Sequence, residues 1–307
     1  MLALLGGNGG GGVGAGPGIA VGAALALRDR ASERLPVAVV AEAAYERPSA
    51  DEALAFLRTL PPIGRDGGLV QPWIEATVED VRSMTTLQFG GHIEGGDHLH
   101  IDGDDWRYVT AFESAEVANL WEIGGADDRT MAHLGHMPAS LHTLNIEQAD
   151  AVTADGVREL RRLTGLRSLM IGWSANIDDE AVAALGWLGG LEELNISGCP
   201  KIEGPGLRFL NRIMLPNLRV LKLSMSALTD DALINLADLG IEELDLSKPP
   251  DWVENAEYHL TFEGILSFLA GAESLRSLRV LTLGNVELSA EQKATLAAAR
   301  PYISLQQ

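Results

Sequence analysis

The sequence predicts an α/β solenoid in which a parallel β-sheet lines the concave face and helices cover the convex face. Three observations lead to this fold class. A pattern of three apolar residues recurs from residue 141 onward. The last positions of each occurrence alternate between apolar and polar residues, as in a short strand with one buried face. A run of apolar residues at helical spacing follows, and such a strand and helix can bury their apolar faces only by stacking on neighbours.

Six units open with the same spacing of apolar residues: Leu141, Leu144 and Ile146; Leu166, Leu169 and Ile171; Leu191, Leu194 and Ile196; Leu218, Leu221 and Leu223; Ile241, Leu244 and Leu246; Leu278, Leu281 and Leu283. Their first residues are separated by 25, 25, 27, 23 and 37 residues. These Leu-x-x-Leu-x-Leu openings resemble the leucine-rich-repeat family. The resemblance covers residues 140–307 and extends to 117–140, which gives a repeat domain of about seven units over 117–307.

A single cysteine refines this resemblance. Cys199, with Ile202 behind it, is similar to the turn cysteine of cysteine-containing, ribonuclease-inhibitor-like repeats. Other units differ from that subtype, because Ser226 takes the equivalent position in one and Asn176 lies one or two places later in another. The resemblance implies a horseshoe-shaped arc that holds a protein partner on its concave face without catalysing a reaction.

The first 80 residues differ from the repeats. Residues 1–18 are uncharged and rich in glycine, and we expect a flexible tail there. We expect residues 19–80 to form a helical region, with one helix over 19–34 and another after Ser49, whose spacing from Glu52 is that of a capping box. The opening Leu35-Pro36 and the following helix resemble an F-box over 35–60, so a ubiquitin-ligase substrate receptor is one alternative function.

Residues 81–116 are expected to cap the solenoid in one of two ways. In one, Leu99 and Ile101 form the strand of an irregular first repeat, and Asp104 caps a helix over 106–112. In the other, residues 86–102 form a hairpin that turns at glycines 95 and 96. The next unit, from 117, would have apolar residues at 117 and 120 and Trp121 in the middle of its strand.

Cap residues predict where the helices of the repeats begin. Thr153, Asp178 and Thr229 precede apolar runs at helical spacing, and Ser289 with Gln292 has the spacing of a capping box. Gly204 and Pro205 precede a run of Leu207, Leu210 and Ile213. We expect a helix after each of these caps, with its apolar side packed against the sheet.

A repeat of this kind binds through the side chains that alternate outward from its inner sheet. The position between the last two apolar residues of each opening, with residues just beyond it, gives the predicted partner-binding set: His100, Trp121, Asn145, Met170, Trp173, Asn195, Lys222, Met225, Asp245 and Thr282. Large aromatic and Met side chains are enriched at protein contacts. The alternative is that Trp121 and Trp173 fold onto neighbouring strands as local cover.

Two further features are expected to be structural. The unit that starts at Ile241 contains an insertion with Trp252 and Tyr258. Insertions can form a binding rim, but we favour the interpretation that both rings cover the exposed edge of adjacent repeats. A row of alternating charge is expected to fix the register of the stack through Arg167, Glu192, Arg219, Glu242 and Arg279.

A cluster of histidines and carboxylates at 92–105 suggests a different function. On an extended backbone, alternate residues share a face, and His98 and His100 would lie beside Asp102. Such a set can bind zinc or iron. A metal-binding protein or metal-dependent enzyme is therefore the second alternative, with His92, His98, His100 and Asp102 as ligands. No motif for nucleophilic or phosphate chemistry is present, and we expect no cofactor and a buried, unreactive thiol at Cys199.

Composition restricts the partner. The 307 residues include 43 acidic and 23 basic side chains, a formal charge of -20, which disfavours nucleic acid and anionic membrane surfaces. A single cysteine permits no intrachain disulfide, which fits a cytoplasmic protein. Residues 81–140 hold ten acidic and three basic side chains, a local charge of -7. We therefore expect a basic protein partner to approach the N-terminal part of the arc.

Overall fold

The computed structural model describes residues 22–25, 37–40, 44–61, 63–65, 68–70, 73–89, 99–250, 253, 258–271 and 276–306, which belong to two compact units, 1–46 and 47–307. In the first unit, strand β1 (Gly22–Leu25) pairs antiparallel with β2 (Val37–Val40). The prediction of a helix over 19–34 is therefore wrong for 22–25, because the valine-rich β2 favours extended backbone and gives β1 a pairing partner. The glycine-rich tail predicted at 1–18 lies outside the described residues.

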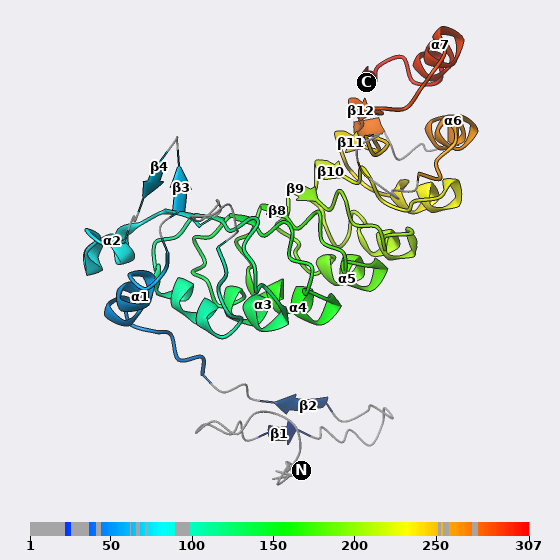
Figure 1. Ribbon diagram of the computed structural model, residues 1–307. Coiled ribbons are helices and arrows are strands. Elements are labelled where there is room, and N and C mark those ends of the chain that lie inside the picture. The colour runs from blue at the N-terminus through cyan, green and yellow to red at the C-terminus, as the bar shows by residue number, and fades with distance from the viewer. Residues whose placement is uncertain are drawn as a thin grey trace, which may run out of the picture. The chain divides into compact units, whose positions relative to one another are not determined.

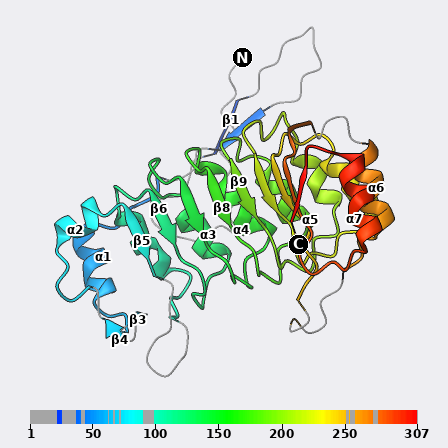
Figure 2. The ribbon, with the colours of Figure 1, turned by 90° about the horizontal axis from the view of Figure 1, so that it is seen from above.

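The second unit is built on one sheet that contains nine parallel strands among the described residues (Figures 1 and 2). The strands lie side by side in chain order: β5 (Thr86–Gln88), β6 (Val117–Asn119), β7 (Thr143–Asn145), β8 (Ser168–Met170), β9 (Glu193–Asn195), β10 (Val220–Lys222), β11 (Glu243–Asp245), β12 (Val280–Thr282) and β13 (Ser304–Gln306). Neighbouring strands pair at equivalent positions, so that Leu144 lies beside Leu169 and Leu169 beside Leu194. This arrangement is the solenoid of stacked strand–helix units that the sequence predicts.

Short helices connect the strands and form the convex face (Figure 1). They are η1 (Asp105–Ala111), α3 (Asp128–Leu134), α4 (Ala154–Glu159), η2 (Leu160–Arg162), α5 (Asp179–Leu185), η3 (Pro205–Phe209), η4 (Asp230–Leu236), α6 (Phe262–Gly271) and α7 (Ala290–Ala299), where η marks a 3₁₀ helix. The predicted caps at Thr153, Asp178 and Ser289 accept backbone N–H bonds, whereas Thr229 precedes η4 without a side-chain cap. Within the described ranges, none of the helices has the length and apolar character needed to cross a membrane.

The segment before the sheet is mixed rather than helical. The capping box of Ser49 and Glu52 is present and begins α1 (Ala50–Leu57), which buries Ala53 and Leu57. A hairpin of β3 (Ile63–Arg65) and β4 (Gly68–Val70) follows, and then α2 (Val78–Ser83). The region predicted as helical at 19–80 thus contains α1 and α2 but also a hairpin between them, so it is not helical throughout.

The first repeat begins at β5, before the strand that one of the two expected forms of 81–116 placed at 99–101. Strand β5 pairs in parallel with β6 and buries Leu87, while Leu99 and Ile101 belong to the segment behind that strand, where His100 bridges to Gly124. Both the hairpin and the strand at 99–101 were therefore wrong predictions. The pattern was hidden because Met and Phe replace Leu in Met84-Thr-Thr-Leu87-Gln-Phe89 and an insertion follows. Asp104 precedes η1 but makes no side-chain cap bond.

The next unit is shifted by two residues from its predicted register. Val117 pairs with Thr143, so the apolar positions of this unit are Ala115, Ala118 and Leu120, which are all buried. Alanine at two of the three positions concealed the pattern. Asn119 consequently holds the strand position that the prediction gave to Trp121, and Trp121 lies two residues further along.

Successive repeats are joined by a carboxylate in every second unit. Asp128, Asp179 and Asp230, spaced 51 residues apart, each begin a convex helix and accept hydrogen bonds from the start of the next one. Asp179 accepts from the backbone N–H groups of Glu203, Gly204 and Gly206 at 3.0, 3.0 and 2.7 Å. The structure therefore has a two-unit period superimposed on the single-repeat period.

Each of these aspartates lies against a glycine of the following unit. Asp128 and Asp230 accept from both the N–H and the hydroxyl of Thr153 and Thr261, respectively. A Cβ at Gly156 or Gly264 would overlap the carboxylate of Asp128 or Asp230, and one at Gly206 would overlap the backbone of Asp179. The close approach of consecutive units therefore requires glycine at these positions.

Candidate interaction surface

A row of side chains from the ends of the strands runs along the concave face. The middle residue of each repeat strand from β5 to β12 is buried, so the residues on either side of it face away from the core. The last residues of the strands form the row: Gln88, Asn119, Asn145, Met170, Asn195, Lys222, Asp245, Thr282 and Gln306. The structure thus aligns six of the predicted residues, whereas His100 lies outside the row and Gln88 takes its place.

Three members of this row have a local structural task. The side-chain Oδ1 atoms of Asn145, Asn195 and Asp245 accept hydrogen bonds from the backbone N–H two residues further on, at 3.0, 3.0 and 2.9 Å. This Asx-type contact turns the chain out of the strand. The same three units donate the N–H bonds that Asp128, Asp179 and Asp230 accept on the convex side. The two-unit period therefore extends to the concave face.

Glu147 follows the row residue Asn145 by two positions, and its carboxylate reaches past the next repeat to the one after it. Its Oε1 accepts a hydrogen bond of 3.0 Å from the Nδ2 of Asn195, across the repeat that carries Gly172. A Cβ at Gly172 would come within 3.4 Å of this oxygen. Burial raises the pKa of the Glu147 carboxyl above its ordinary value of 4.5, although the Asn145 hydrogen bond and Lys222 act in the opposite direction.

The raised pKa predicts the pH dependence of a Glu147→Gln variant. Because the folded protein holds this proton more tightly than the unfolded chain, the stability contributed by Glu147 falls as the pH rises from about 4.5 through the folded-state pKa. We therefore expect wild type to lose stability relative to Glu147→Gln between pH 5 and pH 8 in a set of urea denaturation curves. A pH-independent difference between Glu147→Gln and wild type would contradict the assignment.

In six of the seven repeats from β6 to β12, one residue adopts a left-handed backbone conformation where the strand has ended. The φ angles are 61° at Glu122, 63° at Gln148, 55° at Trp173, 58° at Met225 and 59° at Asn285, and Gly198 has 72°. Such a conformation costs a non-glycine residue roughly 1–2 kcal/mol. Lys248 occupies the same repeat position without a positive φ, and the proline that follows it favours extended backbone there. The turn geometry that recurs between repeats, not the residue type, therefore fixes where Trp173 and Met225 lie.

The Trp173 indole lies against the next repeat and is still partly open to solvent. A Cβ at Gly198 would lie 2.8 Å from the indole Cδ2, so the ring covers the glycine of the next repeat. The residue nevertheless remains 36% exposed. Trp121, also half-buried, lies one place before the left-handed residue of its own unit.

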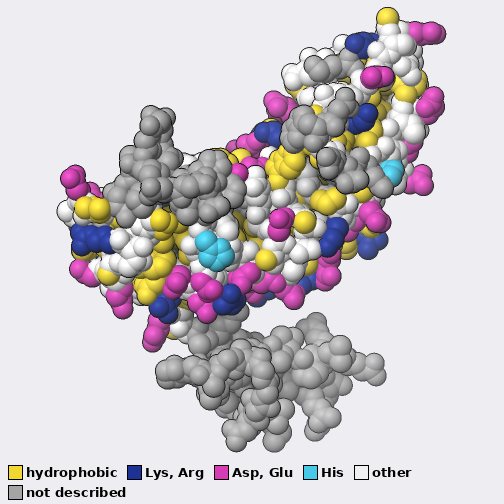
Figure 3. Space-filling view, in the orientation of Figure 1, with side chains coloured by type: hydrophobic (Ala, Val, Ile, Leu, Met, Phe, Trp, Pro, Cys, Tyr) yellow, Lys and Arg dark blue, Asp and Glu magenta, His cyan; other side chains and the backbone are white. Residues whose placement is uncertain are grey.

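Trp173 also lines a groove formed by the turns that follow β6, β7 and β8, which we call the rim groove. Its other lining residues are Glu122, Ile123, Gly124, Gln148 and Asp150, and its volume is about 470 Å³. Two carboxylates and one indole thus meet around one open space. Acidic side chains recur over the face of the second unit shown in Figure 3.

The predicted row of alternating charge is formed in part. Arg167 pairs with Glu192 and Arg219 with Glu242, each at 2.5 Å. Arg279 instead lies over the Tyr302 ring, with its guanidinium carbon 5.7 Å from the ring centre. On the concave row itself, Lys222 pairs with Glu193 at 2.8 Å. These exposed pairs are each worth a few tenths of a kcal/mol and align neighbouring strands.

The structure gives no support to the metal site. His92 and His98 lie outside the described residues, and among those described no group of three or more His, Cys, Asp or Glu side chains is placed to hold a metal ion. Asp102 instead lies 3.5 Å from Arg129, which also pairs with Asp104 and Asp127.

Two other predicted residues have structural surroundings. Cys199 is fully buried, and burial raises the pKa of its thiol to about 12, so the thiol stays protonated at neutral pH. In the insertion, the Tyr258 hydroxyl donates to the Leu246 carbonyl at 3.0 Å, and burial raises its pKa. Tyr258 therefore packs against the strand end of its own repeat, while Trp252 lies outside the described residues.

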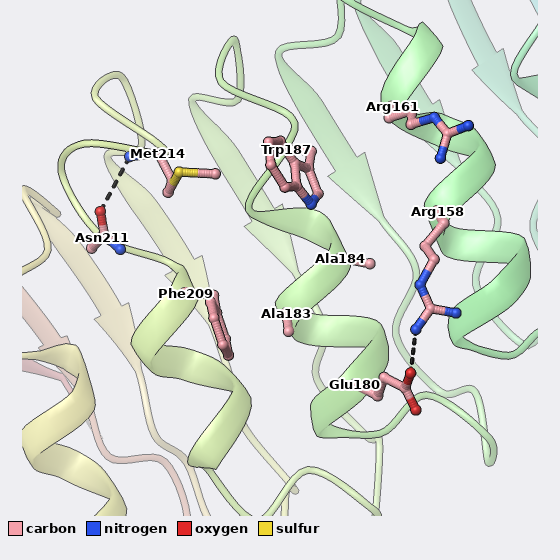
Figure 4. A pocket seen from close by; sticks show the side chains of 9 residues that line it. All are labelled: Arg158, Arg161, Glu180, Ala183, Ala184, Trp187, Phe209, Asn211 and Met214. Carbon is pink, nitrogen blue, oxygen red and sulfur yellow. Dashed lines mark hydrogen bonds and ion pairs between the residues drawn. The ribbon is translucent and has the colours of Figure 1, made fainter. Parts of the chain in front are cut away.

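Sequence reasoning missed two surfaces. The rim groove depends on the left-handed turn, which brings Glu122 and Trp173 to one edge although they are 51 residues apart. A second groove lies on the convex face between α4, α5 and η3, lined by Arg158, Trp187 and Phe209 among others (Figure 4). A large apolar residue just after a predicted helix, such as Trp187, was the available signal for the second groove.

Comparison with known proteins adds little to this description. A scan against known protein families finds no match. Among solved structures, the chain is similar to an internalin, inlF, from Listeria monocytogenes, with 18% sequence identity and a TM-score of 0.49. The match covers 84% of this chain and 67% of the internalin chain.

Proposed function

We propose that this protein is a non-catalytic, cytoplasmic interaction module that holds a basic segment of a protein partner on the N-terminal half of its concave sheet and in the adjacent rim groove. The observation that carries the proposal is the meeting of the Trp173 indole with the carboxylates of Glu122 and Asp150 around one groove. A Lys or Arg side chain can lie on an indole face and pair with nearby carboxylates at the same time.

The surroundings of the groove favour the same partner. Met170 lies in the same repeat as Trp173, and Met225 lies two repeats further along the chain. Both offer adaptable apolar contacts beside the charged groups. The local charge of -7 over 81–140 would attract a basic segment before contact, which accelerates association at low salt. Asn145, Asn195 and Asp245, whose oxygens hold the backbone, would instead shape the surface.

We further propose that the repeats belong to the cysteine-containing, ribonuclease-inhibitor-like subtype. Cys199 and the buried Ser174 and Ser226 are the third residues after the last apolar strand position of their units. Each packs a small, weakly polar side chain into the turn behind its strand, as the Ser226 hydroxyl does by donating to the Leu223 carbonyl at 2.7 Å. Neither the metal-dependent nor the F-box alternative gains support from the described residues.

A capture experiment tests the concave proposal. We expect the Trp121→Ala/Trp173→Ala double variant to lose partners that the wild-type chain captures from a lysate of its source. The leading captured partner, purified, should bind the double variant about tenfold or more weakly, because anchors of this kind carry most of the binding energy. Its association rate with wild type should fall with added salt.

The matched control is Trp187→Ala, which removes an exposed indole from the convex face. This variant should capture the same partner as wild type. An unchanged set of partners with the double variant, or a salt-independent association rate, would exclude binding of a basic segment on the concave side.

A further inference from the structure

The convex face carries an apolar patch that the concave proposal leaves without a role. Trp187 is 70% exposed, Phe209 43% and Ile213 87%. The sequence placed Ile213 in the buried run of a helix, but η3 ends at Phe209 and Ile213 extends into solvent, so that prediction was wrong. Large apolar side chains clustered on the surface of a soluble protein mark interaction sites.

These side chains border a groove of about 650 Å³, which we call the convex groove. Its apolar lining comes from neighbouring turns of the solenoid (Figure 4). Trp187 follows α5 in the chain, Phe209 ends η3, and Met214 follows η3. Ala183 and Ala184 of α5 also line it, and their small side chains leave room beside the indole. A volume of this size can accept several apolar side chains of a peptide.

The edge of the convex groove is basic, unlike most of this acidic chain. Arg158 and Arg161 line one end, and the guanidinium of Arg208 lies 4.9 Å from the centre of the Phe209 ring. Glu180 is the one carboxylate in the lining and is paired with Arg158 (Figure 4). Arg158 also pairs with Asp155, so three guanidinium groups stand against two carboxylates here, in a chain whose formal charge is -20.

We infer that the convex groove binds an acidic amphipathic helix of a partner protein. The apolar side chains of that helix, at i, i+3 or i+4 and i+7, would occupy the space between Trp187, Phe209 and Met214. Its carboxylates would lie towards Arg161 and Arg208. Trp and Arg are the residue types that most often anchor an interface.

The same charges disfavour two other occupants. A second copy docked symmetrically would bring two basic patches into one interface, because a two-fold interface uses the same patch on both copies. A basic segment would meet three guanidinium groups here and would prefer the rim groove. The two surfaces therefore select partners of opposite charge.

Selecting a library of displayed random helical peptides for binding to the full-length wild-type protein tests the inference. Peptides are counter-selected against Trp187→Ala/Phe209→Ala, whose two exposed substitutions should leave the melting curve unchanged. We expect the discriminating peptides to share apolar residues at helical spacing and a net negative charge. Replacing their Asp and Glu by Asn and Gln should weaken binding about tenfold or more.

Matched variants separate this result from the concave proposal. Ile234→Ala removes another exposed apolar residue of the convex face, 72% exposed and outside this lining, and should retain peptide binding. Trp121→Ala/Trp173→Ala should also retain it, whatever becomes of the concave partner. Discriminating peptides that are neutral or basic would overturn the inference, as would the absence of any such peptide. A wild-type dimer that Trp187→Ala dissociates would reassign the groove to self-association.

Discussion

Replacement of Asp179 by Ala should lower the free energy of unfolding by about 3 kcal/mol, because three backbone N–H groups lose a charged acceptor and hydrogen bonds to charged groups are worth roughly 1.5–3 kcal/mol each. The estimate lies below the sum for three such bonds because Asp179 is only half-buried and water can replace part of the lost bonds. Urea denaturation followed by circular dichroism measures the change.

Two further variants and a local measurement identify the cause. Asp179→Asn keeps an acceptor oxygen and should lose less stability than Asp179→Ala. Glu203→Ala changes an exposed side chain in the same segment but keeps its N–H, and should shift stability by less than about 0.5 kcal/mol. Amide hydrogen exchange at Glu203, Gly204 and Gly206 should accelerate in Asp179→Ala. Unchanged exchange there would show that the carboxylate does not join the two repeats.

Gly264→Ala should destabilise the protein by about 2–3 kcal/mol, although alanine favours helices and residue 264 lies in α6. The added methyl group would overlap the carboxylate of Asp230, which must then release the N–H and hydroxyl of Thr261. Thermal and urea denaturation of the single variant measure the loss.

In a double-mutant cycle, the effect of Gly264→Ala on the free energy of unfolding should change sign. In an Asp230→Ala background the obstacle is absent, and Gly264→Ala should stabilise by about 0.5–1 kcal/mol through helix propensity. Gly271→Ala, at the other end of α6 with nothing within 4 Å of the added Cβ, is the matched control and should give a small change in either background. Additive effects of the two substitutions would refute the contact between Asp230 and Gly264.

The sequence predicted the repeat where leucine marks it and failed where other residues replace leucine. Units from 141 to 283 have Leu or Ile at every apolar position, and the strands lie where the pattern placed them. In the unit before them, Ala115 and Ala118 fill two of the positions, so the pattern could be read two residues out of register. In the first repeat, Met84 and Phe89 fill two of the three apolar positions. Burial selects for volume and apolarity at these positions, and several residue types meet that demand.

The two-unit period was visible in the sequence but had no meaning there. The spacing of Asp128, Asp179 and Asp230, and that of Asn145, Asn195 and Asp245, can be counted in the chain. Either set is also what helix caps and a polar strand face produce. Only the hydrogen bonds between units show that the first set joins repeats and that the second set turns the chain out of its strands.

The candidate surfaces depended still more on tertiary structure. The sequence by itself determined the solenoid, its strand row and its acidic character, because these follow from a regular spacing of apolar residues and from counting charges. The rim groove and the convex groove were decided by the tertiary structure alone. Each brings together side chains from different repeats, Trp173 with Glu122 and Trp187 with Phe209, and their proximity depends on how far each turn advances the chain and on which side of it each residue emerges. A one-dimensional period fixes which residues are equivalent, whereas the packing of successive turns fixes which residues are neighbours.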